Sequence, residues 1–175
     1  KSPSKTRRNL LEEIDLPGEY FLDRENGMLY LYPVEGMNDK SDIRLTTLGE
    51  AFMSIQGASY IDIEGIAFRN SRSLGIYMGN TQEIRVKKCQ FENLGIMGVS
   101  MGDAFGSTKV LFPDLETNNV FNTVQDCYIK NTGSGAVFIE GGDRRLLRPG
   151  ANVIENCEMT EFSFFNEICP GVRFR

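Results

Sequence analysis

The stretch Ile61-Asp62-Ile63-Glu64-Gly65-Ile66-Ala67-Phe68-Arg69-Asn70 recurs, with its pattern of apolar and polar residues kept, as Ile84-Arg85-Val86-Lys87-Lys88-Cys89-Gln90-Phe91-Glu92-Asn93. A glycine and a second short apolar stretch follow each copy, as Gly75-Ile76-Tyr77-Met78-Gly79 and Gly98-Val99-Ser100-Met101-Gly102. Equivalent residues, such as Phe68 and Phe91, are 23 positions apart. A fixed period of this length is typical of a stacked repeat.

Two further copies follow at longer intervals. The third is Cys127-Tyr128-Ile129-Lys130-Asn131 with Gly135-Ala136-Val137-Phe138-Ile139, and the fourth is Val153-Ile154-Glu155-Asn156-Cys157-Glu158-Met159 with Val172-Arg173-Phe174. The extra residues, 103–118 before the third copy and 162–170 within the fourth, are predicted to form loops on the surface of the stack.

Alternation of apolar and polar residues inside each copy predicts strands rather than helices. Short strands stacked at one coil per repeat predict an all-β fold, a right-handed parallel β-helix whose coils are about 4.8 Å apart. We expect about four coils in residues 56–175, incomplete at the C-terminal end. An uncapped end would expose an unpaired strand edge, so we also expect the chain to be a fragment of a longer β-helix whose remaining coils act as its partner.

Residues 1–55 are expected to form a separate N-terminal region. Two alternating stretches, 19–23 and 28–32, flank Asn26-Gly27, and this dipeptide is a strong hairpin signal. Residues 43–48 and 51–55 are predicted to be short strands that lead into the first coil.

Stacking would bring equivalent side chains into ladders. Two ladders are predicted to point inward: Ile66, Cys89, Cys127 and Cys157 form one, and Phe68, Phe91, Ile129 and Met159 form the next. Asn70, Asn93 and Asn131 are predicted to stack at a turn, where asparagine is a favoured residue. We therefore interpret the cysteines and asparagines as structural, although adjacent cysteines are close enough in principle for a disulfide.

Composition excludes several classes of function. The net charge is −5 without a basic stripe, which argues against a nucleic-acid partner, and no apolar run is long enough to span a membrane. The chain has no histidine, which removes serine and cysteine triads that need one. Its four cysteines form no Cys-x-x-Cys pair, so no metal site of the zinc type is predicted.

Two segments resemble a known superfamily. Pro17-Gly18-Glu19-Tyr20-Phe21-Leu22-Asp23 with Leu29-Tyr30-Leu31-Tyr32-Pro33 resembles the PGEWYLD…G.LYYYP hairpin of large right-handed β-helix carbohydrate-active proteins, the pectate-lyase-like superfamily. Gly141-Gly142-Asp143-Arg144 with Asn152-Val153-Ile154-Glu155-Asn156 resembles their GGDR…NVVENN coil. This chain has Cys157-Glu158-Met159-Thr160 where relatives often have NHIH. The resemblance implies a polysaccharide or oligosaccharide partner and an extracellular or periplasmic location.

The resemblance also implies that one parallel sheet carries the substrate groove. On the second strands, alternation places Ile76, Val99, Val137 and Val172 inward, together with Met78, Met101, Ile139 and Phe174. The residues between them face outward in one stripe, which consists of Tyr77, Ser100, Phe138 and Arg173. Rings suit sugar faces and arginine suits carboxylates, so this stripe is a candidate substrate-binding surface. The alternative is an outer face covered by a loop or by another domain.

Charged residues gather just beyond these strands, at Asp103, Glu140, Asp143, Arg144 and Arg145. Paired carboxylates suit glycoside hydrolysis, with their separation setting the stereochemistry, so Glu140, Asp143 and Asp103 are the candidate catalytic residues and Arg144 a candidate substrate-binding residue. A carboxylate cluster is also suited to Ca²⁺, as in β-helix lyases. Alternatively, Asp143 and Arg144 form a salt-bridged turn after Gly141-Gly142.

Three hypotheses about function remain open at this point. The first is a glycoside hydrolase that acts on a complex polysaccharide through paired carboxylates and needs no cofactor. The second is a Ca²⁺-assisted polysaccharide lyase, and the third is a non-catalytic carbohydrate-binding or adhesive β-helix.

Overall fold

The structure is a computed structural model that describes residues 11–102, 118–143, 145–164 and 169–174. The chain divides into two compact units between Arg44 and Leu45. The division precedes the expected 55/56 boundary because the strand at Met53–Gln56 is already hydrogen-bonded into the repeat region. The expected strand at 43–48 does not form.

The first unit contains a 3-10 turn, η1 (Leu11–Glu13), and a two-stranded antiparallel hairpin of β1 (Tyr20–Asp23) and β2 (Met28–Leu31). Asp23 organises the connection, because its Oδ1 accepts the N–H groups of Glu25 at 3.0 Å and Asn26 at 3.1 Å. The pKa of Asp23 is lowered, mainly by the hydrogen bond from the Asn26 side chain and next by the one from the Asn26 main chain. The hairpin predicted around Asn26-Gly27 is confirmed.

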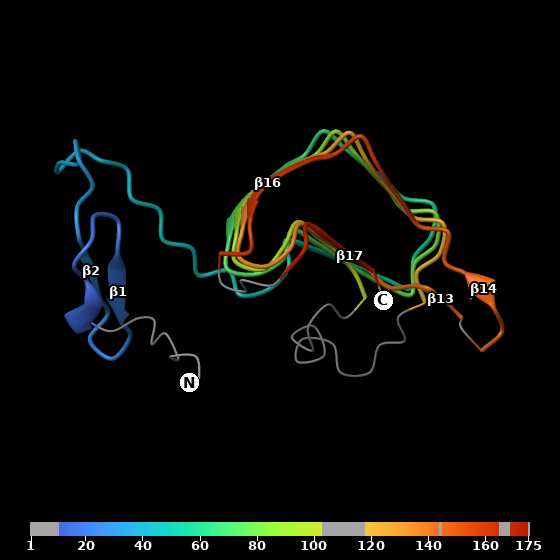
Figure 1. The fold of residues 1–175 in the computed structure, drawn as a ribbon, viewed down its shortest axis with the longest axis horizontal. Helices are drawn as coiled ribbons and strands as arrows, with labels where there is room; N and C mark the ends of the chain where they lie inside the picture. Colours follow the sequence, from blue (N-terminus) through green and yellow to red (C-terminus); the bar gives the residue numbers. More distant parts are fainter. Residues whose placement is uncertain (1–10, 103–117, 144, 165–168, 175) are drawn as a thin grey trace, which may run out of the picture. The chain divides into compact units, whose positions relative to one another are not determined.

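The second unit is a parallel β-helix in which each coil contributes one strand to each of three parallel sheets (Figure 1). The first sheet contains β4 (Asp62–Glu64), β7 (Arg85–Lys87), β10 (Thr123–Gln125) and β15 (Val153–Glu155). The second contains β5 (Ala67–Ser71), β8 (Gln90–Leu94), β11 (Tyr128–Thr132) and β16 (Glu158–Phe162). The third contains β3 (Met53–Gln56), β6 (Ile76–Gly79), β9 (Val99–Met101), β12 (Val137–Ile139) and β17 (Val172–Phe174).

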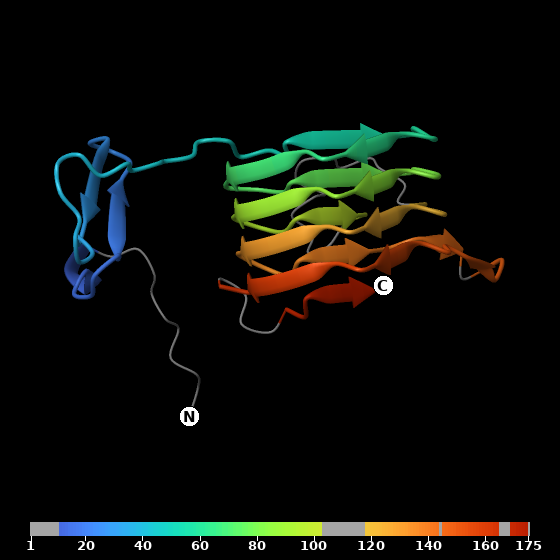
Figure 2. The same ribbon diagram turned by 90° about the horizontal axis from the view of Figure 1, so that it is seen from above.

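Figure 2 shows the coils as successive layers, with equivalent strands side by side. A small antiparallel pair, β13 (Gly142–Asp143) and β14 (Arg148–Pro149), projects between β12 and β15. Successive coils stay in register across unequal steps of 23, 38 and 30 residues, as the hydrogen-bonded pairs Asn70–Asn93, Asn93–Asn131 and Asp126–Asn156 show. The predicted parallel β-helix, with its insertions confined to connections, is therefore confirmed.

Each copy contains a corner that the alternation of apolar and polar residues does not predict. The stretch 61–70 is not one strand but two, β4 and β5, which are separated by a residue with positive φ. The same position in successive coils is occupied by Gly65 (φ 71°), Lys88 (50°), Asp126 (54°) and Asn156 (49°). The apolar spacing carries the signal, because Val86 and Cys89 are three residues apart, whereas strict alternation requires two.

The predicted asparagine ladder is present at the next corner. Asn93 Nδ2 donates to Asn70 Oδ1 at 3.0 Å, and Asn131 Nδ2 donates to Asn93 Oδ1 at 2.7 Å. All three have positive φ, between 54° and 62°, a conformation that asparagine tolerates better than most residues. The ladder therefore combines a required backbone shape with side-chain bonds between coils.

A second, buried asparagine network holds the corner before the first sheet. Asn119 Oδ1 accepts from the Thr81 hydroxyl at 2.8 Å, and Asn122 Oδ1 accepts the Ile84 N–H at 2.9 Å. Asn119 and Asn122 have no exposed surface. Because a buried amide without partners costs free energy, these bonds satisfy the polar groups that this corner buries.

The core lies between the sheets and consists of stacked apolar ladders. The rings of Phe68 and Phe91 lie 5.0 Å apart and nearly parallel, and Cys89 and Cys127 are buried free thiols. Two residues predicted to point inward are nevertheless exposed, Ile66 by 42% and Phe174 by 70%. Both belong to terminal coils of the stack, where one side of an inward residue has no described coil against it.

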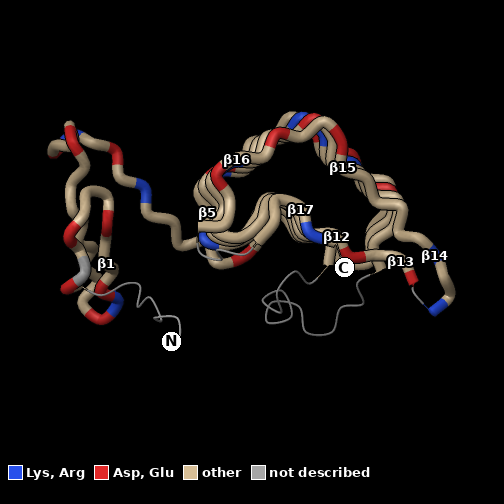
Figure 3. Tube along the Cα trace, in the orientation of Figure 1, with Lys and Arg blue, Asp and Glu red and all other residues tan. Residues whose placement is uncertain are grey.

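Charged residues recur along the strands of the first two sheets (Figure 3), and several of them pair between neighbouring coils. Lys88 Nζ lies 2.7 Å from Glu64 Oε1, and Arg69 Nε lies 3.2 Å from Glu92 Oε2. Exposed pairs of this kind contribute little stability individually. Arg69 and Glu92 are register partners on neighbouring strands, so the observed register places opposite charges side by side.

We expect Asn93→Ala to lower the free energy of unfolding by about 1–2 kcal/mol, because it removes two inter-coil hydrogen bonds and places alanine at positive φ. Asn93→Gly removes the bonds but tolerates the backbone shape, so it should cost less. Urea unfolding of both variants measures the difference. Equal stability of both variants and the parent would contradict a role for the ladder.

We expect Gly95→Ala to destabilise the fold by about 2–3 kcal/mol. A Cβ at Gly95 would collide with main-chain atoms of Arg72, and no side-chain rotation relieves a contact with the backbone. Gly49 is the matched control, because a Cβ there would meet nothing within 4 Å. Gly49→Ala should leave the thermal unfolding midpoint nearly unchanged, and a similar loss in both variants would refute the close approach.

Candidate functional site

The predicted outward stripe is in register along the third sheet. Tyr77 pairs with Ser100, Ser100 with Phe138, and Phe138 with Arg173. Ser54 on β3 extends the same row at its other end. The sequence therefore placed these side chains correctly relative to one another.

The expectation that the whole stripe is exposed is wrong. Tyr77 and Phe138 are each 1% exposed and Ser100 is fully buried. Tyr77 and Phe138 belong to a second apolar cluster with Leu74 and Met97, separate from the core inside the coils. This outer face carries large apolar side chains, and their burial removes apolar area from water. Tyr77, Ser100 and Phe138 therefore fit the alternative expectation, in which the outer face of this sheet is covered.

Ser100 is also engaged locally, since its hydroxyl donates to the main-chain oxygen of Gly102 at 2.9 Å. Only the two ends of the row remain at the surface: Ser54 and Arg173 are both exposed. Among the predicted substrate-binding residues that the structure describes, Arg173 is thus the one that solvent reaches.

Glu140 directly follows β12 and is half-buried. Its N–H donates to the main-chain oxygen of Met101 at 2.8 Å, which fixes the backbone beside Gly102. A Cβ at Gly102 would lie 2.7 Å from Glu140 Oε2, and the φ of Gly102 is +94°. The glycine therefore leaves the space in which the Glu140 carboxylate lies.

Asp143 lies in β13, three residues after Glu140, and is also half-buried. Its Oδ1 accepts the N–H of Arg145 at 2.8 Å and the N–H of Leu146 at 3.0 Å. Asp143 therefore organises the turn between β13 and β14, whereas the predicted salt bridge with Arg144 stays a prediction because Arg144 lies outside the described residues. The turn begins at Gly142, whose φ of +82° is a conformation that glycine adopts readily.

The structure brings Glu140 and Asp143 to one corner of the stack, where the third sheet ends. Asp103 and Arg144 lie outside the described residues, so the predicted pairing of Asp103 with Glu140 stays a prediction. Among the described residues, no group of three or more carboxylate or cysteine side chains is arranged to hold a metal ion. None of the described helices has the length and apolar character needed to cross a membrane.

A hollow of about 360 Å³ lies elsewhere, at the corner between the first and second sheets of the third and fourth coils. Its lining residues come in two equivalent triplets: Asp126, Cys127 and Tyr128, and Asn156, Cys157 and Glu158. Asn156 Nδ2 donates to Asp126 Oδ1 across the two coils. This corner is not among the predicted sites, although the same pattern of a polar residue, a cysteine and a polar residue occurs in both coils.

The comparisons with known proteins agree with the geometry. A family model described as the right handed beta helix region matches residues 42–163, more than half of the 175-residue chain. Searches of curated proteins and of solved structures found no match. The matched segment runs from before β3 to the residue after β16 and so contains nearly the whole stack. The chain therefore belongs to the right-handed β-helix family.

Proposed function

We propose that this β-helix is part of a glycoside hydrolase that acts on a complex polysaccharide, with Glu140 as its principal carboxylate. The observation that carries the proposal is the placement of Glu140: it is half-buried at the end of β12, over a glycine that leaves room for its side chain. The resemblance of the hairpin and of the 141–156 coil to carbohydrate-active β-helix proteins supports the substrate class.

In this proposal Glu140 is the acid–base group that protonates the glycosidic oxygen as the bond to the sugar breaks. Asp143, or Asp103 from the preceding coil, is the second carboxylate, which attacks the sugar carbon or activates water. Asp143 has one oxygen in the turn bonds, and those bonds hold its carboxyl group in a fixed orientation. Location outside the cell or in the periplasm goes with a polysaccharide substrate.

Substrate contact is proposed at Arg173 and Arg144, whose guanidinium groups suit the carboxylates of acidic sugars. The burial of Tyr77, Ser100 and Phe138 removes them from the proposed contact surface. The proposed sugar chain therefore approaches the corner at Glu140 and does not lie along the whole sheet.

A second candidate is a carbohydrate-binding surface without catalysis. The engagement of Asp143 in the turn favours it, because this role accounts for that carboxylate without chemistry. A Ca²⁺-assisted lyase is the third outcome that the experiment distinguishes.

We expect the protein to cleave at least one member of a polysaccharide panel, and Glu140→Gln to lower kcat by about 100-fold or more. Glu155→Gln, at an exposed position on the first sheet, is the matched control and should keep full activity. Unchanged turnover in Glu140→Gln would refute the site. An unsaturated product that is lost with a chelator would indicate the lyase, and binding without cleavage would indicate the non-catalytic surface.

Asp143→Asn separates the structural role of this residue from a catalytic one. An amide oxygen still accepts the two N–H groups, so we expect stability within about 0.5 kcal/mol of the parent, whereas Asp143→Ala should lose about 1 kcal/mol. Thermal unfolding and turnover are measured on both variants. Full activity in Asp143→Asn would exclude a catalytic role for Asp143 and leave only its role in the turn.

A further inference from the structure

A row of four equivalent residues runs along the corner between the third and first sheets. Each lies two residues before a strand of the first sheet, and the row consists of Tyr60, Glu83, Phe121 and Ala151. Their N–H groups bond between coils in the same way, at 3.0 Å from Tyr60 to Gln82, 3.2 Å from Glu83 to Val120 and 2.8 Å from Phe121 to Gly150. Neighbouring members of this corner row are therefore one strand spacing apart, about 4.8 Å.

The backbone is left-handed at every position of the corner row. The φ angles are 61° at Tyr60, 53° at Glu83, 59° at Phe121 and 51° at Ala151. Glycine and asparagine adopt this conformation most readily, whereas it is unfavourable for a bulky side chain. Among the described residues, the two aromatic residues with a positive φ both lie in this row. The corner thus explains the backbone shape but not the rings of Tyr60 and Phe121.

Burial in the core does not explain these two rings either. Phe121 is 53% exposed although a described coil lies on each side of it, and Tyr60 is 72% exposed. Exposure at this corner therefore does not depend on a coil being the first or last of the stack. Because both rings bear a backbone cost without gaining core burial, their side chains indicate a role at the surface.

The corner row rests on a rigid support. Asn122, directly after Phe121, is fully buried, and its Oδ1 accepts the N–H of Ile84 at 2.9 Å. Its Nδ2 donates to Asn152 Oδ1 at 3.1 Å, so these bonds join three successive coils behind the row. Since the φ angles also agree along the row, the two rings start from equivalent directions and are two coils apart, about 10 Å.

Polar side chains accompany the rings. Glu83 lies between them in the row, and the residues two positions further on are Asp62, Arg85 and Thr123. Asp62 and Arg85 are exposed, and Arg85 Nη1 lies 3.8 Å from Asp62 Oδ1. The surface is therefore not a continuous apolar patch of the kind that marks a protein interface. It combines separate flat rings with hydrogen-bond donors and acceptors.

The corner row also adjoins the candidate carboxylate. Glu140 ends the third-sheet strand of the third coil, and the next residue, Gly141, packs against the main-chain oxygen of Asn119, because a Cβ at Gly141 would collide with that atom. Asn119 is two residues before Phe121. A ligand that lies on the row is therefore on the same connection between sheets that carries Glu140.

We propose that the corner row binds neutral units of a sugar chain that lies along the stack, with the rings of Tyr60 and Phe121 beneath two of its units. A pyranose ring has an apolar C–H face that suits an aromatic ring, and a rim of hydroxyl groups that suits Asp62 and Arg85. In an extended sugar chain the length of one unit is close to the spacing of the coils, so units two apart meet the two rings.

Glu83 sets the charge preference of the row. Its carboxylate lies between the two rings, where it accepts hydrogen bonds from hydroxyl groups and repels a sugar carboxylate. The inference rests on the proposed function, because it takes a polysaccharide as the substrate class, and it adds a binding track that leads to Glu140.

Isothermal titration calorimetry on the Glu140→Gln variant tests the row without hydrolysis of the ligand. The probes are β-1,4-linked hexasaccharides of glucose, xylose and mannose, with hexagalacturonate as the acidic probe. At least one neutral hexasaccharide should bind. Adding Phe121→Asn should weaken that binding about tenfold or more, whereas Phe121→Tyr should keep it. Tyr128→Ala removes a half-buried ring on the second sheet of the same coil and is the matched control, which should bind like the background.

Thermal unfolding separates a loss of binding from a loss of fold. Asparagine suits a positive φ better than phenylalanine, so Phe121→Asn should unfold at or above the midpoint of the background. A clearly lower midpoint would give the ring a structural role and would overturn the inference.

Three further results would overturn the inference: no binding of any neutral hexasaccharide, equal affinity with and without Phe121→Asn, or tighter binding of hexagalacturonate. A dimer in sedimentation velocity that Phe121→Asn abolishes would show that the row is a contact between copies of this chain, and would also overturn it. Turnover tests the proposed function separately. Binding that depends on Phe121 in a protein without hydrolysis would support the row alone, and hydrolysis with unchanged binding in Phe121→Asn would support Glu140 alone.

Discussion

The structure depends on hydrogen bonding between equivalent positions of successive coils. Main-chain groups of the described strands and corners bond to equivalent positions of neighbouring coils, for example Gly75 N–H to the oxygen of Met97 and Gly98 N–H to the oxygen of Ala136. Since the bonding is parallel and in register, each side chain stacks on its counterpart. Because the strands pair in register, residues at equivalent positions of the repeat form ladders that run along the stack.

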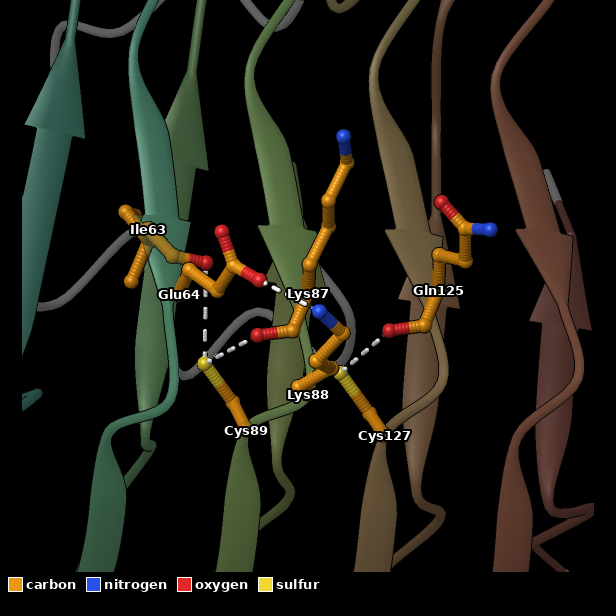
Figure 4. Close-up of polar contacts among 7 residues, drawn as sticks. All are labelled: Ile63, Glu64, Lys87, Lys88, Cys89, Gln125 and Cys127. Carbon is orange, nitrogen blue, oxygen red and sulfur yellow. Dashed lines mark hydrogen bonds and ion pairs between the residues drawn. The ribbon is translucent and has the colours of Figure 1, made fainter.

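The ladders form although successive coils differ in length, because each ladder bond depends only on the residues at equivalent positions of two neighbouring coils. The step of 38 residues between the second and third coils preserves the same asparagine bond as the step of 23. Corners are more demanding than strands, since they require positive φ at equivalent places in every coil. Glycine, asparagine and aspartate fill several of these places, whereas Lys88 occupies one with a charged side chain that pairs with Glu64 (Figure 4).

The distribution of chemistry over the coil follows from the same geometry. The inner faces are apolar and hold the buried thiols of Cys89 and Cys127. Ion pairs join neighbouring coils at the first two sheets, where Figure 3 shows charged residues along the trace. The outer face of the third sheet is different, because it is packed into a second apolar cluster. The candidate carboxylates lie where a strand of this third sheet ends, because Glu140 and Asp143 follow β12.

The sequence alone determined the strand class, the 23-residue repeat, the asparagine ladder and the row from Tyr77 to Arg173, because each depends on local alternation and on spacing along the chain. The corner near Lys88 also leaves a trace in the sequence, since Val86 and Cys89 are three positions apart instead of two. Alternation by itself does not identify that spacing as a turn.

Only the tertiary structure decided which side chains water reaches. Alternation assigns Tyr77 and Phe138 to an outer face, but both are buried there in a cluster with Leu74 and Met97. The same holds for Cys89, which is buried between two neighbouring coils, whereas Cys157 at the equivalent position of the fourth coil is only partly buried. Exposure and hydrogen bonding are set by neighbours from other coils, and a pattern within one coil does not contain them.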